Sequence, residues 1–304
     1  MAETNNTKKE KSSVWKNFLK SEFFYHYKHN LPAIIGSILV LIAILVAVFG
    51  KFLAPQNPYD LTQIDLMDSY LPPAWSDGGS MKFLLGTDNQ GRDILSAIIY
   101  GSVSSLTIGL VGMLASCLIG TTLGLIAGYF GGKVDSFIMR IADIQLSFPS
   151  MLIALFIMSV FGRGIDKLLI ALTMVGWVKY ARTVRGETLS VRNKEYVEAA
   201  RTIGLPNYRI ILKHVMPNVV TSIIVLATIQ VGDFILTEAT LSFLGVGVPI
   251  TEPSLGLLVK TGFDVLFSGL WWASVFPGLY IMLVVFGINL LGDFLRDELN
   301  PNLK

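Results

Sequence analysis

Long uncharged, apolar stretches alternate along the chain with shorter segments that carry most of its charged residues. A hydrocarbon core about 30 Å thick is crossed by roughly 20 apolar residues in a helix. The pattern therefore predicts an all-α membrane protein with six transmembrane helices. The predicted helices span residues 31–53, 103–130, 137–161, 165–181, 219–244 and 268–292.

The second and fourth spans are the least regular of the six. The uncharged run 94–132 would form a helix about 58 Å long, too long for one upright crossing. Gly101 and the serines after it predict a break, which puts the span at 103–130 and leaves 54–102 as an external loop. The fourth span is short because Asp166 and Lys179 lie close to its ends.

Residues 1–30 form a basic leader before the first span. Its bulky apolar residues recur at nearly helical spacing: Trp15, Phe18, Leu19, Phe23 and Tyr27. This spacing, with lysines between, predicts an amphipathic helix lying flat in the cytoplasmic interface. An ordinary cytosolic extension of the first span fits the same residues, and both interpretations stay open.

Lysine and arginine are concentrated in the leader and in the segment 181–217, whereas residues 54–96 hold six aspartates against Lys82 and Arg92. Because cytoplasmic loops carry the excess of Lys and Arg, both termini and the segment 181–217 are predicted to be cytoplasmic. The acidic tail after the last span points weakly to the other side.

Composition agrees with a membrane protein and excludes several other classes. The chain is 52% hydrophobic and 15% charged, with a mean hydropathy of +0.59, which excludes a disordered chain and argues against a water-soluble domain. A net charge of +2 does not indicate nucleic-acid binding. Cys117 is the only cysteine, so no intrachain disulfide forms. Glycines every four residues predict a tightly packed second span with Cys117 buried: Gly120, Gly124, Gly128 and Gly132.

The chain lacks the motifs that would indicate catalysis or nucleotide binding. Neither H-E-x-x-H nor G-x-S-x-G occurs. The nearest text to a phosphate-binding loop, around Gly131, has Ala127 where its first glycine is required and Val134 where Ser or Thr is required. We therefore expect no catalytic residue, metal site or cofactor in this chain, and any ATP must be hydrolysed by a partner.

Two carboxylates fall inside the fifth span. Asp233 and Glu238 are five residues apart and so lie on different faces of a helix. Ionisable groups at membrane depth are costly and usually functional. They are interpreted either as the lining of a solute pathway or as hydrogen-bonded helix-packing sites.

The cytoplasmic loop 195–217 has the pattern of two short amphipathic helices. Apolar residues recur at i, i+3, i+4 and i+7 in two sets, Tyr196, Ala199, Ala200, Ile203 and then Tyr208, Ile211, Leu212, Val215. Gly204 is a natural helix end between them, and Pro217 precedes the fifth span. The pattern predicts a docking surface for a partner; two helices resting on lipid remain the alternative.

The loop resembles the EAA loop of ABC importer permeases, through Glu198-Ala199-Ala200, Gly204 and Pro217. Three further stretches are similar to the peptide-type permeases. They are Gly86-Thr87-Asp88 with Gly91-Arg92-Asp93 and Ser96, the run 238–247, and Gly292-Asp293 with Arg296-Asp297 and Asn300-Pro301. The leader and the large outer loop match the C-type permease of the dipeptide/oligopeptide/nickel group. Ala97 and Leu255 depart mildly from the pattern.

This resemblance implies a translocation subunit of the prokaryotic cytoplasmic (inner) membrane. Its implied partners are a second, B-type permease, two cytosolic ATPases that bind ATP and Mg²⁺, and an external or periplasmic solute-binding protein. The residues implied in ATPase docking and coupling are Glu198, Ala199, Ala200, Gly204 and Pro217. The implied cargo is a di- or oligopeptide, with nickel or another small solute as the alternative. A secondary transporter and an intramembrane enzyme are less well supported, because no internal repeat or catalytic constellation is visible.

Overall fold

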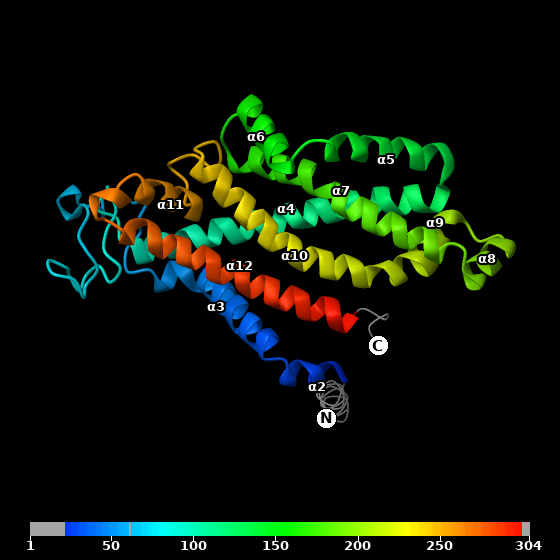
Figure 1. Cartoon of the computed structure of the whole chain (residues 1–304), viewed down its shortest axis with the longest axis horizontal. Coiled ribbons are helices and arrows are strands. Elements are labelled where there is room, and N and C mark those ends of the chain that lie inside the picture. Colours follow the sequence, from blue (N-terminus) through cyan, green and yellow to red (C-terminus); the bar gives the residue numbers. More distant parts are fainter. Residues whose placement is uncertain (1–21, 61, 300–304) are drawn as a thin grey trace, which may run out of the picture.

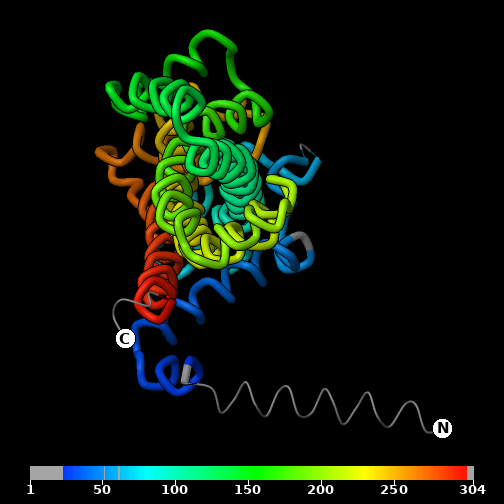
Figure 2. The backbone as a smooth tube through the Cα atoms, turned by 90° about the vertical axis from the view of Figure 1, so that its right-hand side faces the viewer, coloured from blue at the N-terminus to red at the C-terminus, as the bar shows by residue number. Residues whose placement is uncertain are grey.

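Four long helices lie side by side along the length of the molecule (Figure 1). They are α4 (Ile94–Phe130), α7 (Ile165–Val191), α10 (Met216–Phe243) and α12 (Trp272–Leu299). The structure is a computed structural model that describes residues 22–60 and 62–299. α3 (Leu31–Leu53) packs on α12 and α4, whereas α5 (Gly132–Leu146) lies on the opposite side of the bundle, against α4 and α7 (Figure 2).

Shorter helices complete the two ends of the bundle. They are α2 (Glu22–His29), α6 (Ser150–Phe161), α8 (Glu195–Thr202), α9 (Asn207–Ile210) and α11 (Leu255–Phe263), with 3₁₀ turns at Leu66–Asp68 and Leu266–Ser268. α8, α2 and the C-terminal part of α12 point to one end, here called the α8 end (Figure 1). The loop 54–93 and α11 form the other, here called the loop end.

Within the described residues, four helical stretches are long and apolar enough to cross a membrane, or five if the bent pair α5 and α6 counts as one. They are α3, α4, the continuous stretch Asn207–Phe243, and α12. α7 is 27 residues long but is not among them, because it carries several charged residues. Three of its cations pair with carboxylates on neighbouring helices, Lys179 with Asp233, Arg182 with Asp143 and Arg185 with Asp135.

The predicted break at Gly101 is wrong. α4 is one helix that begins at Ile94, so the loop after α3 ends at Asp93 and not at residue 102. Asp93 caps the helix, since its Oδ2 accepts hydrogen bonds from the backbone N–H and the hydroxyl of Ser96. Gly101 lies inside the helix, and a Cβ there would come within 3.2 Å of Leu255. This glycine allows α11 to pack closely and does not interrupt α4.

The third predicted span is not one straight helix. α5 and α6 are bent by 88° at residues 147–149. Pro149 explains the bend: it has no N–H to continue α5, and it disfavours helical geometry at Phe148. The last helix also differs from its predicted bounds, since α12 extends to Leu299.

α4 and α7 pack closely through glycines, as predicted. A Cβ at Gly124 or Gly128 would lie 2.6 Å from Ala181 O or from Thr188 Cβ, and one at Gly120 would clash with Trp177 O. Gly132 does not belong to this contact, because α4 ends at Phe130 and no atom lies within 4 Å of where a Cβ of residue 132 would be. Cys117 is only partly buried.

The described part of the leader packs on the C-terminal helix of the same chain. Phe23 and Tyr27 meet the ring of Phe294 edge-on at centroid distances of 5.4 and 5.6 Å. His26 Nδ1 lies 2.8 Å from Glu298 Oε2. Other residues named in the sequence patterns lie outside the described residues: Trp15, Phe18, Leu19, Asn300 and Pro301.

Candidate functional site

α8 turns one face to its own chain and another to the surroundings. Val197 and Ala200 are buried, and Ala200 is only 5% exposed. Glu198 and Ala199 are exposed, and Ile203 is 80% exposed. The predicted apolar stripe is therefore divided: Ala200 seats the helix, while Ala199 and Ile203, with Tyr196, are left exposed.

Gly204 ends α8 in the left-handed conformation, with φ of +83°. The N–H of Leu205 donates to Ala200 O at 3.1 Å and that of Gly204 to Arg201 O at 3.0 Å, the pattern of a Schellman cap. No atom lies within 4 Å of where a Cβ would be. A side chain at Gly204 is therefore opposed by backbone strain and not by packing.

The loop is fixed to the end of α4. The hydroxyl of Tyr129 donates to Asn207 Oδ1 at 2.9 Å, and the guanidinium of Arg201 lies 5.5 Å from the centre of the Tyr129 ring. Arg192 Nη1 donates to Gly128 O at 2.8 Å. α8 and α9 therefore move together with α4 unless these contacts break.

The second predicted loop helix is not separate from the fifth span. α9, a π-helical turn at Ile211–Val215 and α10 form one continuous helical stretch, Asn207–Phe243. Pro217 is exposed in the first turn of α10. Because proline has no N–H and its ring clashes with the carbonyl four residues earlier, the wider π turn before it lets the helical stretch continue. The loop therefore continues into α10 without a break in the helix.

Asp233 and Lys179 form an ion pair between α10 and α7, with 2.7 Å between Oδ2 and Nζ. Their side chains are 44% and 56% exposed. Both line a pocket of about 450 Å³ whose walls are the bend between α5 and α6 and the facing sides of α7 and α10. Two amides, Gln145 and Gln230, also line this pocket.

Glu238 has a different environment, although it lies on the same helix. Its side chain is fully buried. Oε1 accepts hydrogen bonds from Ser242 at 2.9 Å and Ser254 at 2.8 Å, and Oε2 accepts one from Ser105 at 2.8 Å. The carboxyl group therefore joins α10 to α4 and to the segment before α11, and the structure does not bring it together with Asp233.

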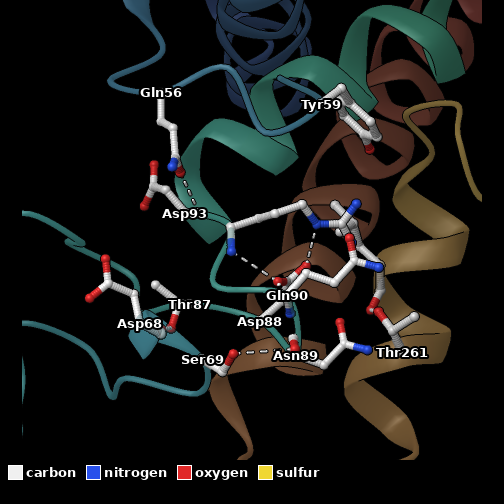
Figure 3. A network of polar contacts seen from close by, with 12 residues as sticks. Gln56, Tyr59, Asp68, Ser69, Thr87, Asp88, Asn89, Gln90, Asp93 and Thr261 are labelled. Atoms are coloured by element: carbon white, nitrogen blue, oxygen red, sulfur yellow. Dashed lines mark hydrogen bonds and ion pairs between the residues drawn. The ribbon is translucent and has the colours of Figure 1, made fainter. Parts of the chain in front are cut away.

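The segment 86–96 forms a compact turn at the loop end (Figure 3). Asp88 accepts from Arg92 Nε at 2.7 Å and from the N–H groups of Gln90 and Arg92. Gln56 Oε1 accepts from the N–H of Asp93. Burial raises the pKa of Tyr59 to about 12, against the opposing effect of Arg92. This network fixes the start of α4 to the loop 54–93.

Comparison with protein families shows to which family the chain belongs. A family described as binding-protein-dependent transport system inner membrane component matches residues 120–304. The chain belongs to this family. A second family, described as the N-terminal TM domain of oligopeptide transport permease C, matches residues 13–73.

Curated relatives are similar over nearly the whole chain. Identity is 42% to the dipeptide transport system permease protein DppC of Escherichia coli (strain K12), over 93% of each chain. It is 37% to DppC of Haemophilus influenzae, over 93% of this chain and 95% of that one. It is 36% to the oligopeptide transport system permease protein OppC of Bacillus subtilis, over 97% and 92%. The resemblance to C-type peptide permeases is confirmed.

Among solved structures, the chain is similar to the inward-facing MetNI methionine ABC transporter. The TM-score is 0.55 at 19% identity, covering 67% of this chain and 96% of that one. At this low sequence identity, the structural similarity establishes the fold and nothing further. The chain thus has the all-helical fold of an ABC importer permease, and about a third of its length has no counterpart in the shorter MetNI chain.

In this permease, sequence reasoning missed Lys179, Gln145 and Gln230 as site residues. Lys179 entered only as a charge that shortened the fourth span. A usable signal was present, because a lysine and an aspartate in two apolar segments are expected to pair. The two glutamines carry no charge and gave no comparable signal.

Proposed function

We propose that this chain is the C-type permease subunit of an ABC importer that moves di- and oligopeptides across the cytoplasmic membrane of a prokaryote. The observation that carries the proposal is 36–42% identity to dipeptide and oligopeptide permeases over more than nine-tenths of the chain. The chain works without covalent chemistry. Partner ATPases bind ATP and Mg²⁺ and drive alternating access.

The proposed topology has six crossings with both termini and α8 in the cytoplasm. The basic segments at the α8 end support this side, and the acidic loop 54–93 lies at the other end. α7 serves as the crossing that composition alone does not reveal. Its pairing with aspartates on α5 and α10 supports that assignment, because paired charges are tolerated at membrane depth.

α8 is the proposed docking element for a cytosolic ATPase. Glu198 and Ala199 lie on the exposed face that would enter a groove of the partner, and Ala200 holds the helix against its own bundle. Gly204 fixes the sharp turn into α9, and Pro217 lies where the loop becomes α10. A displacement of α8 by the ATPase is therefore transmitted to α10 through a rigid connection rather than a flexible linker.

Asp233 is proposed to line the pathway, since it borders the pocket, whereas the enclosure of Glu238 by serines supports a packing role. The remaining partners are a B-type permease that completes the pathway and an external solute-binding protein that delivers the peptide. Both are inferred from the family, whose members are named for binding-protein-dependent transport.

Uptake by cells tests the cargo. A strain lacking this gene should lose uptake of a radiolabelled dipeptide and regain it when the gene is restored. Uptake of radioactive nickel should not change. Loss of nickel uptake with dipeptide uptake intact would replace the peptide assignment with the nickel alternative. Unchanged uptake of both would contradict the proposed function, provided no second peptide importer is expressed in the strain.

A further inference from the structure

In the proposed topology, the pocket that contains Lys179 and Asp233 lies deep in the membrane-spanning part. Asp233 is ten residues before the end of α10 at Phe243, a distance of about 15 Å along the helix axis. That is about half of a hydrocarbon core of roughly 30 Å. Charged groups at this depth face protein or water rather than lipid. The pair therefore marks a polar space and not a lipid-facing surface.

The same wall holds a polar atom that nothing in the described chain satisfies. Gln230 lines the pocket and is 1% exposed, and its Oε1 has no hydrogen-bond partner among the described residues. A buried acceptor without a donor is unfavourable. The other amide of the pocket, Gln145, has different partners: it donates to Val175 O and accepts from Trp177 Nε1.

The ion pair itself is suited to exchange. Half-exposed ion pairs contribute little to stability, and lysine carries its charge on a flexible four-carbon stem. A molecule with its own carboxylate and ammonium groups can therefore take over both partners without a large loss. The pocket volume of about 450 Å³ falls in the range of roughly 300–1,000 Å³ typical of small-molecule sites.

We propose that the pocket is a peptide-binding site that works by exchange of ion pairs. Lys179 Nζ binds the C-terminal carboxylate of a short zwitterionic peptide, Asp233 binds its α-ammonium group, and Gln230 Oε1 accepts a backbone N–H. An extended chain covers about 3.3–3.6 Å per residue, so Lys179 and Asp233 must swing apart to reach the two ends of a dipeptide. The inference rests on the proposed function and adds that the permease itself reads the peptide termini.

The site can be tested by asking whether a bound peptide protects an introduced cysteine from labelling. The binding protein is left out of this experiment. Ser150 is exposed and lines the pocket, whereas Ser159 is exposed on the same helix and does not line it. Ser150→Cys and, as the control, Ser159→Cys are placed in a Cys117→Ala background of the complete complex in nanodiscs. Labelling of this chain by a neutral maleimide is then timed with alanyl-alanine, its C-terminal amide or its N-acetyl form present.

Alanyl-alanine should slow labelling at Ser150→Cys and not at Ser159→Cys. The amide and the N-acetyl form should need about tenfold higher concentrations to slow labelling equally. A tenfold loss of affinity, to about that order, is expected when one charge-assisted hydrogen bond is missing. Lys179→Met should remove the difference between the acid and the amide and keep the discrimination against the N-acetyl form. Asp233→Asn should remove the difference between alanyl-alanine and its N-acetyl form and keep the discrimination against the amide. If either variant fails to assemble, the comparison of the three peptides on the otherwise unchanged chain still decides.

Three results would overturn the proposal. They are no labelling at Ser150→Cys, equal protection by all three peptides, and equal weakening of all three by Lys179→Met, which would show that the pair only joins α7 to α10. The proposed function fails separately. If cells take up dipeptide through this permease but all three peptides protect the cysteine equally, only the proposed exchange site is wrong.

Discussion

Two carboxylates on one helix show how surroundings decide a residue's role. Asp233 shares a pocket wall with a lysine, and Glu238 is enclosed by three serine hydroxyls. In the sequence both are single charges in an apolar run, so the alternatives of pathway and packing applied equally to each. Their partners are contributed by segments up to 133 residues away, which is why local pattern could not separate them.

Replacement of Glu238 should weaken the fold. Glu238→Ala leaves the buried hydroxyls of Ser105 and Ser254 without their acceptor, at about 1–3 kcal/mol for each unsatisfied group. We expect the melting temperature of the complex to fall clearly in Glu238→Ala and less in Glu238→Gln, which keeps one acceptor oxygen. Asp233→Asn is the control, because Asp233 is half exposed. An unchanged melting temperature in Glu238→Ala would refute the packing role.

Gly204→Val should uncouple ATP hydrolysis from transport. Gly204 adopts the left-handed conformation, with φ +83°. In a β-branched residue this conformation costs roughly 1–2 kcal/mol, and relief of that strain changes the angle between α8 and α9. We expect an assembled complex that hydrolyses ATP with reduced peptide uptake per ATP. Gly269→Val is the matched control, since Gly269 has φ +89° and an equally open Cβ position at the other end of the molecule. Equal uncoupling by both variants would contradict a specific role of the turn at Gly204 in coupling.

At the scale of elements, apolar runs located the long helices but not their joints. An interpretation of Gly101 as a break puts the start of α4 at the wrong residue, although Asp93 and Ser96 form a readable helix cap. Pro149 could have predicted the bend of the third span. The continuity of α9 with α10 was not readable, because Pro217 normally marks a helix start and only the π turn reveals otherwise.

The close contact of α4 and α7 predicts a specific sensitivity. Gly124→Leu would force the side chain into Ala181 and Val184, so we expect poor assembly and low expression in the membrane. Gly186→Leu on α7 is the control, because no atom lies within 4 Å of a Cβ at that position. Wild-type yield and stability of Gly124→Leu would show that the helices can separate without harm.

α8 predicts a one-sided pattern of contacts with the ATPase. Ala199 is exposed and Ala200 is buried. Ala199→Cys should therefore cross-link to cysteines placed along the groove of the ATPase, while Ala200→Cys on the next position should not. Cross-linking is read by electrophoresis of the assembled complex. Failure of Ala199→Cys with several neighbouring groove positions would favour a helix that rests on lipid.

At the scale of the whole molecule, one helical stretch links the two candidate sites. It begins at Asn207, beside the α8 turn, and passes Gln230 and Asp233 on the pocket wall. The 26 residues from Asn207 to Asp233 span about 39 Å as a helix. A displacement at the α8 end would therefore reach the pocket through one continuous helical element, and in the proposed function this element couples ATP hydrolysis to alternating access.

The most direct test is peptide accumulation in proteoliposomes that contain the complete complex, with the binding protein outside and ATP with Mg²⁺ inside. We predict that a labelled dipeptide accumulates only when both are present, and that Gly204→Val lowers accumulation per ATP hydrolysed while Gly269→Val does not. Accumulation driven by an ion gradient without ATP, or none with all components present, would contradict the account.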